Sequence, residues 1–159
     1  MSRSLGAALP PALQARLSQK DLPRFLGRGL PLLTVDDRGR PHPMFCSYLE
    51  LLAVNATTVR VAVGARSSAR RNVEARGAAT LLIVEPDVTM YVKCRAAGAP
   101  LIAGELARFD VVVEDVLEDV AAEGEEGARV TGGLTYAPVP ALDSDWARAT
   151  LAVLHLERA

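Results

Sequence analysis

Hydrophobic and polar positions alternate in several short runs along the chain, which is the pattern of half-buried β-strands. Segments that contain Pro, Gly or Asp separate these runs, as is typical of hairpin turns. The pattern predicts six strands, one of them almost continuously apolar, at residues 30–36, 41–51, 57–65, 78–85, 88–98 and 101–113. Pro41 and Pro43 lack N–H donors, so the start of the second strand should be an edge or a bulge.

Other segments carry helical spacing or the residues that begin and end helices. We expect helices at residues 10–18, 20–29, Ser67–Arg76, 114–123 and 144–157. The last helix has one stripe, which should pack against the core, made of Trp146, Thr150, Val153 and Leu154. Helices that flank mostly antiparallel strands predict a mainly β domain, a six-stranded antiparallel barrel with peripheral helices.

Composition supports one folded domain over residues 1–159. Half of the residues are hydrophobic, and the formal net charge is −1. We place the core at about residues 22–113 and a helical and loop extension at residues 114–159. Near-neutral charge gives no case for a nucleic-acid partner, and no apolar run has membrane-spanning length. Two cysteines without metal-site spacing make a reducing cytoplasm the expected location.

Charge is unevenly distributed along the chain. Residues 60–76 hold five arginines opposed only by Glu74, and residues 110–126 hold eight acidic residues and no basic one. These segments could be two solvated faces. They could also contact each other, within one chain or between two chains.

Arg70 and Arg71 lie at the expected start of a helix, just after Ser67 and Ser68. A helix N-terminus already carries partial positive charge, so two cations there should be costly unless a negative group joins them. Free backbone N–H groups, serine hydroxyls and guanidinium groups together suit a phosphate. The alternative is that both arginines meet carboxylates elsewhere, for example in the segment 114–126.

Two stretches, LPLLTVDDRGRPHPMF and VRVAVGARSSARRNVEARGAATLLIV, resemble the pyridoxamine 5'-phosphate oxidase-like, FMN-binding split-barrel proteins. The first is similar to the family's opening hairpin, and the second to its third strand, Ser-x-x-x-x-Asn helix and apolar fourth strand. The resemblance extends from about residue 22 to 108. It implies a homodimer with two cofactor sites at its interface, and most often FMN; relatives bind deazaflavin F420 or haem.

The resemblance also implies which residues hold the cofactor. The phosphate would lie at the start of the helix, and the ring system along the second strand and beside the third. The residues at these places are Met44, Phe45, Cys46, Ser47, Ala62, Val63, Ser67, Ser68, Arg70 and Arg71. Asn72 matches the motif, where we expect it to form local hydrogen bonds. His42 could be an axial haem ligand or a polar residue beside a turn.

A flavin would carry the redox chemistry of a small-molecule oxidoreductase, which needs no protein nucleophile. The rival functions are a non-catalytic flavin, F420 or haem carrier or sensor, and a cofactor-free interaction module. The family commonly has basic residues where this chain has Met44 and Ala69. Oxidation of pyridoxamine phosphate itself is therefore not expected. The Gly- and Pro-rich segment 124–143 could be a lid near the site or a plain loop.

Overall fold

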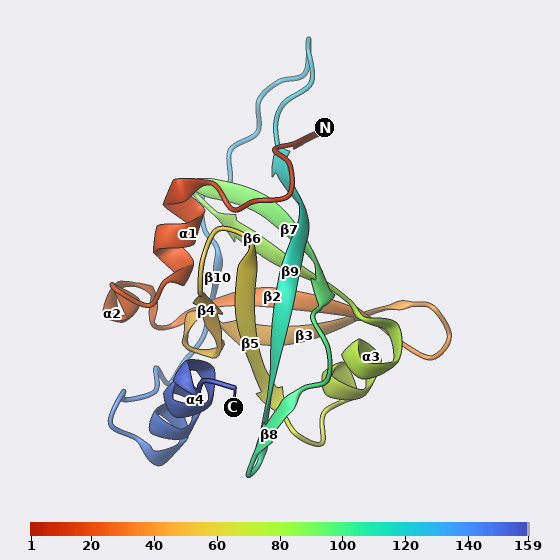
Figure 1. The fold of residues 1–159 in the computed structure, drawn as a ribbon. Helices are drawn as coiled ribbons and strands as arrows, with labels where there is room; N and C mark the ends of the chain where they lie inside the picture. Colours follow the sequence, from red (N-terminus) through yellow and green to blue (C-terminus); the bar gives the residue numbers. More distant parts are fainter. Residues whose placement is uncertain (159) are drawn as a thin grey trace.

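The computed structural model describes residues 1–158, which form a curled sheet with helices at its periphery (Figure 1). The strands are β1 (Ser2–Ser4), β2 (Arg28–Val35), β3 (Pro41–Ser47), β4 (Leu51–Ala53), β5 (Thr58–Gly64), β6 (Ala78–Glu85), β7 (Val88–Ala96), β8 (Leu101–Ala103), β9 (Leu106–Asp119) and β10 (Leu134–Thr135). The helices are α1 (Pro11–Leu17), α2 (Leu22–Phe25), the 3-10 turn η1 (Tyr48–Glu50), α3 (Ser68–Arg76) and α4 (Asp145–His155).

Every pairing among the described strands is antiparallel. The main order is β10-β2-β6-β7-β9-β5-β4, and β3 pairs with β2, while β1 and β8 pair with β9. Strand β9 is 14 residues long and bends around the barrel, because it pairs with β7 in one half and with β5 in the other. The mainly β, antiparallel split barrel predicted from the sequence is confirmed, although residues 1–158 contain ten strands rather than six.

The barrel opens beside β3, whose only partner is β2. The Asp36 N–H donates to the Arg40 carbonyl at 2.9 Å, which fixes the alternation of hydrogen bonds along this hairpin. By that alternation, residues 41, 43 and 45 direct their backbone polar groups toward the open edge. Because Pro41 and Pro43 have no N–H, this edge offers few donors to another strand. The edge position expected from the prolines is confirmed.

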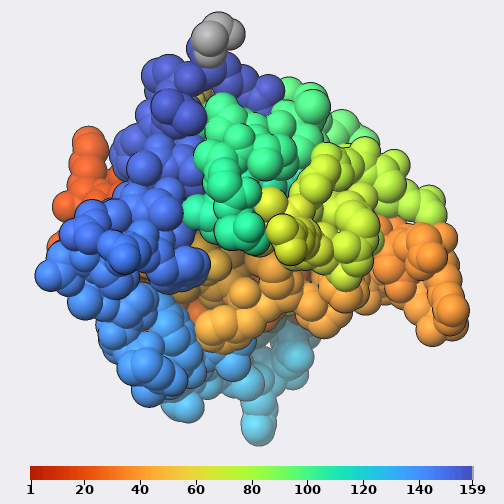
Figure 2. Space-filling model, turned by 90° about the horizontal axis from the view of Figure 1, so that it is seen from below, coloured from red at the N-terminus to blue at the C-terminus, as the bar shows by residue number. Residues whose placement is uncertain are grey.

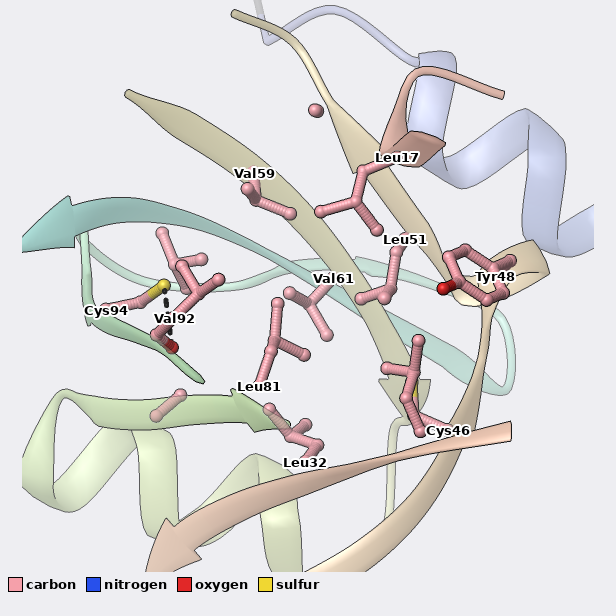
Figure 3. Packing of buried hydrophobic residues seen from close by; sticks show 14 of the residues in the cluster. Leu17, Leu32, Cys46, Tyr48, Leu51, Val59, Val61, Leu81, Val92 and Cys94 are labelled. Carbon is pink, nitrogen blue, oxygen red and sulfur yellow. Dashed lines mark hydrogen bonds between the residues drawn. The ribbon is translucent and has the colours of Figure 1, made fainter. Parts of the chain in front are cut away.

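The core fills the barrel interior (Figure 3). Side chains at alternate positions point inward, and Leu32, Val61, Leu81 and Val92 are each at most 2% exposed. A second, smaller cluster lies outside the barrel wall, where Leu52 and Ala62 pack against Val153 and Leu154 of α4. Helix α4 is therefore part of the folded unit and covers one outer side of β5.

Two helical predictions were wrong. Residues 114–119 continue β9, because Val113 and Val116 face the interior while acidic side chains between them face outward, and the pairing with β7 outweighs helical propensity. Residues 120–123 are not helical. Trp146 does not belong to the core stripe of α4: its side chain is 46% exposed, and Ala147 is buried in its place.

Other boundaries differ modestly from expectation. A turn at Gly104 divides the predicted strand 101–113 into β8 and β9, and η1 ends the predicted strand 41–51 at Ser47. The second helix is only four residues long, and Gly27 follows it with φ of 79°, the left-handed conformation expected there. No helix within residues 1–158 is long and apolar enough to span a lipid bilayer.

Candidate cofactor site

Helix α3 begins and ends as its sequence predicts. The Ser67 hydroxyl accepts a hydrogen bond from the Arg70 N–H at 3.1 Å, which caps the N-terminus. Gly77 ends the helix with φ of 71°, a conformation that costs other residues free energy. Ala69 and Val73 are buried, so they hold one side of α3 against the barrel. The opposite side is thereby directed outward.

Arg70 is neutralised within its own helix. Its guanidinium donates to the Glu74 carboxylate at 2.9 Å and to the Ala65 carbonyl at 2.9 Å. The carboxylate comes from one turn further along α3 and not from the acidic segment 110–126. The two alternatives for the arginine pair were a bound phosphate and a carboxylate partner, and Arg70 has the carboxylate partner.

Arg71 has no carboxylate partner among residues 1–158. Its guanidinium donates to the Ser68 hydroxyl at 2.8 Å and to the Arg66 carbonyl at 3.0 Å. The guanidinium of Arg71 thus lies beside a serine hydroxyl near the helix N-terminus, and no carboxylate of residues 1–158 pairs with it directly. This is the arrangement that a bound anion would complete.

Arg71 lines a cavity of about 490 Å³ between α3 and the β2–β3 hairpin. Figure 2 shows α3 (yellow-green) beside the projecting turn of this hairpin (orange). The volume lies within the usual range of small-molecule sites, roughly 300–1,000 Å³. The lining residues are Val35, Asp36, Asp37, His42, Ser68, Arg71, Asn72, Ala75 and Arg76.

Hydrogen bonds between α3 and the hairpin set the width of this cavity. The Asn72 amide donates to the Thr34 hydroxyl at 3.0 Å, and Thr34 in turn donates to the His42 carbonyl at 3.3 Å. Arg76 donates to the Asp37 carbonyl at 2.9 Å at the other end. Asn72 forms a hydrogen bond, but its partner on β2 is 38 residues away in the sequence, so the bond is not the local one expected.

Charged side chains of both signs line the cavity: Arg71 and Arg76 are positive, and Asp36 and Asp37 are negative. The Asp36 carboxylate accepts the N–H groups of Arg38 and Arg40, at 2.9 and 2.8 Å, which shapes the hairpin turn. Its acceptors are thus partly occupied. Arg71 and the Ser68 hydroxyl, both on α3, offer donors for one phosphate-sized anion, and His42 lies in the opposite wall on β3.

The ring-binding residues expected on β3 do not share one surface, because successive side chains of a strand point to opposite faces. Met44 is half-buried and packs against the core, and Cys46 and Ser47 are buried. Phe45 is 51% exposed on the outer face, where its ring lies over Gly29 and meets Tyr136 edge-on at 5.6 Å. None of the four lines the cavity.

The expected positions on β5 are also covered. Ala62 is 1% exposed and lies beneath α4, and Val63 is 3% exposed and belongs to the barrel core. A ring could contact Ala62 only if α4 moved away. The structure thus brings Ser68 and Arg71 together at the cavity, while Ser67 acts as the helix cap and Arg70 as a local ion pair.

The sequence reasoning missed part of the cavity wall. Ser68, Arg71, Asn72, Ala75 and Arg76 are spaced as i, i+3, i+4, i+7 and i+8, which is one face of a helix. That spacing was the available signal for Arg76. The contribution of His42 depends on the docking of the hairpin against α3, which no local pattern predicts.

The cysteines are not candidates for covalent catalysis. Burial and the nearby Glu50 carboxylate raise the pKa of Cys46 well above its usual range. Burial, with a smaller effect of Glu114, raises the pKa of Cys94 to about 12. Both thiols are therefore protonated near neutral pH and weak nucleophiles. Within residues 1–158 no group of three His, Cys, Asp or Glu side chains could hold a metal ion.

Comparisons with known proteins identify the fold by structural similarity. No model of a known protein family matches the chain, and no curated protein sequence matches it. A candidate pyridoxamine 5'-phosphate oxidase from Lactobacillus delbrueckii has a similar structure, with a TM-score of 0.53 and 13% identity over 72% of this chain and 98% of that one.

Two further solved structures are also similar. Flavin reductase PheA2 has a TM-score of 0.51 and 12% identity over 83% of this chain and 100% of its own. A structure from Mycobacterium thermoresistibile is described as a homologue of nitrilotriacetate monooxygenase component B. It has a TM-score of 0.51 and 15% identity over 86% of this chain and 96% of its own. The chain therefore has the pyridoxamine 5'-phosphate oxidase-like split-barrel fold.

Proposed function

We propose that this protein binds a phosphorylated flavin, FMN in the first place, and acts as a flavin-dependent oxidoreductase on a small molecule. The observation that carries the proposal is Arg71, a guanidinium without a carboxylate partner among the described residues, beside Ser68 in a cavity of about 490 Å³. A similarly folded protein that is named as a flavin reductase supports the choice of a flavin. F420 and haem are the alternative cofactors.

The donor set of the cavity fits a phosphate. Arg71 offers a planar pair of N–H groups, which suits two phosphate oxygens, and Ser68 adds a hydroxyl. The Asn72 amide is already engaged with Thr34 and positions the helix. To bind an anion, Arg71 would release Ser68 or the Arg66 carbonyl, both of which remain close enough to steer the guanidinium.

The bound flavin would supply the hydride chemistry. The residues of this chain would bind and orient it: Arg71 and Ser68 hold the phosphate, and the open edge of β3 offers the Phe45 N–H and the carbonyls of residues 41, 43 and 45 to the ring. The buried thiols take no part. A homodimer, as the family resemblance implies, would cover the ring from the other side.

An absorption spectrum of the untreated protein tests the cofactor. A flavin spectrum, or the appearance of one after incubation with FMN and gel filtration, is the expected result. A Soret band would indicate haem as the cofactor in place of flavin. A colourless protein that does not retain FMN would refute the proposal. Reduction of the bound flavin by NADH or NADPH, followed by oxidation by an added acceptor, separates an oxidoreductase from a carrier.

A further inference from the structure

The cofactor cavity has two walls, and the proposed phosphate donors lie on only one of them. Ser68 and Arg71 belong to α3, while the opposite wall is the β2–β3 hairpin. The polar side chains of the hairpin wall are those of Asp36, Asp37 and His42. Both carboxylates repel a phosphate, so His42 is the hairpin side chain that could attract one.

The side chain of His42 points toward α3. Directly paired residues of antiparallel strands share one face of the sheet, and His42 pairs with Thr34. The Thr34 hydroxyl accepts a hydrogen bond from the Asn72 amide of α3 at 3.0 Å, so this face is the one that α3 covers. Pro41 and Pro43 restrict the backbone on both sides of His42 to extended conformations, which holds the ring in this direction.

The imidazole of His42 has no competing partner among residues 1–158. The His42 carbonyl accepts the Thr34 hydroxyl at 3.3 Å, but no hydrogen bond or salt bridge involves the ring nitrogens. The chain has one other histidine, His155, whose Nε2 lies 3.0 Å from the side-chain oxygen of Gln19. His155 is on α4 and does not line the cavity. The two histidines therefore allow a matched comparison between a ring in the cavity and a ring outside it.

The groups that attract and repel an anion are separated along α3. Arg76 donates to the Asp37 carbonyl at 2.9 Å, so the hairpin turn lies beside the C-terminal end of the helix. Ser68 begins the helix, about 12 Å away along its axis. His42 lies level with Asn72, one turn from Ser68, because the residue paired with His42 contacts that amide. His42 is therefore nearer than Asp37 to the end that offers the phosphate donors.

Four charged residues share the cavity with His42. They are Asp36 and Asp37 on the hairpin and Arg71 and Arg76 on α3. Their formal charges cancel. A phosphate monoester carries about −1.5 to −2 charges near pH 7, so its binding leaves excess negative charge in the cavity. Protonation of His42 would offset part of this excess.

We propose that the protonated ring of His42 is a second phosphate contact, opposite Arg71, and that it makes binding of the phosphorylated cofactor tighter as the pH falls. The inference rests on the proposed function, because the phosphate is that of FMN. Histidine is the side chain whose charge changes between about pH 5 and 8. A nearby anion favours the charged ring, and by linkage the charged ring favours the anion by the same factor.

FMN titrations of the full-length protein at two pH values test this role. Flavin fluorescence gives the affinity at about pH 6 and about pH 8.5, below and above the range in which histidine loses its charge. His42→Gln keeps a polar side chain that is always neutral. At the lower pH the wild type should bind FMN about five- to tenfold more tightly than His42→Gln, because a charged donor is replaced by a neutral one. At the higher pH the two affinities should be about equal.

Comparison at one pH removes the effects that all proteins share. The phosphate of FMN itself changes charge near about pH 6, but it does so equally for every variant. His155→Gln removes the histidine outside the cavity, so this control should follow the wild type at both pH values. Riboflavin lacks the phosphate, and its affinity should differ little between the wild type and His42→Gln at either pH.

His42→Lys separates the charge of the side chain from its shape. Lysine stays positive at both pH values, so this variant should bind FMN about five- to tenfold more tightly than the wild type at about pH 8.5. No hydrogen bond of residues 1–158 uses the His42 ring, so we expect both variants to fold, which circular dichroism and thermal unfolding check. If His42→Gln does not fold, the comparison of His42→Lys with the wild type is sufficient.

The outcomes distinguish this inference from the proposed function. FMN binding in which His42→Gln loses the same factor at both pH values, or none at either, would overturn the role of His42 and leave the flavin site in place. The same conclusion would follow if His42→Lys binds no more tightly than the wild type at the higher pH, or if His155→Gln or riboflavin shows the same pH effect. A wild-type protein that binds FMN at neither pH would refute the proposed function, and the role of His42 with it.

Discussion

Replacing Arg71 with alanine should weaken FMN binding by about 10- to 150-fold. The structure leaves this guanidinium without a carboxylate partner among residues 1–158, so its charge is available to the ligand. Hydrogen bonds to charged groups contribute about 1.5–3 kcal/mol, and about 1.4 kcal/mol corresponds to a tenfold change in affinity. The effect on folding stability should be small, because Arg71 is exposed.

Arg70→Ala is the matched control for this prediction. The two arginines are neighbours with the same formal charge, but Arg70 is paired with Glu74 at 2.9 Å. Its removal should therefore change FMN affinity by less than about threefold, since long-range effects of exposed charges are screened. Quenching of flavin fluorescence on binding gives both affinities. Equal losses in the two variants, or a larger loss for Arg70→Ala, would show that the side-chain roles assigned here are wrong.

Three further predictions concern the fold. Glu85→Gln should lower the free energy of unfolding by about 3 kcal/mol, because the buried Glu85 carboxylate accepts hydrogen bonds from two arginines and a tyrosine. Urea unfolding measures this free energy, and Glu126→Gln is the control. Equal losses of stability in the two variants would contradict the role assigned to Glu85. Cys46 and Cys94 should not react with a disulfide reagent at about pH 8 until the protein unfolds, since their raised pKa values leave little thiolate, and rapid native-state reaction of either thiol would refute this. Ser144→Ala should lower the free energy of unfolding by about 1 kcal/mol, because it removes the N-terminal cap of α4, and Ser144→Asp should restore the stability. The same urea unfolding measures both variants. An unchanged free energy of unfolding in Ser144→Ala would mean that this cap does not stabilise the helix.

Local sequence patterns predicted the elements that local interactions determine. Helix α3 was placed correctly because Ser67 caps it, Gly77 ends it, and Ala69 and Val73 lie four residues apart on its buried face. The β2–β3 hairpin was placed correctly because a Gly-containing turn separates two apolar runs. In these segments propensity, capping and burial all favour the same structure.

Prediction failed where pairing with distant strands decided the structure. The segment 114–119 has acidic residues at spacings that suit a helix, but its valines complete a ladder with β7. In the stripe of α4, Thr150, Val153 and Leu154 are buried as predicted, but Ala147 lies in the core where Trp146 was expected. Adjacent residues of a helix point about 100° apart, so the neighbour of a residue at the margin of the buried face can be exposed.

The candidate site was only partly predictable for a similar reason. The sequence pointed to the start of α3, and Ser68 and Arg71 do line the cavity there. It could not distinguish Arg71 from Arg70, because that difference depends on which direction each side chain takes and on the carboxylate of Glu74. The sequence could not show whether the expected ring-contacting residues of β5 are accessible or buried. Ala62 is buried because α4 packs over it, and that packing depends on how distant segments dock.

The most direct test of the proposed site compares FMN with riboflavin, which is the same ring system without the phosphate. The wild-type protein should bind FMN about tenfold or more tightly than riboflavin, and Arg71→Ala should remove most of that difference. Equal affinity of the wild type for the two ligands, or a preference for FMN that survives in Arg71→Ala, would contradict the assignment of this cavity as a phosphate site.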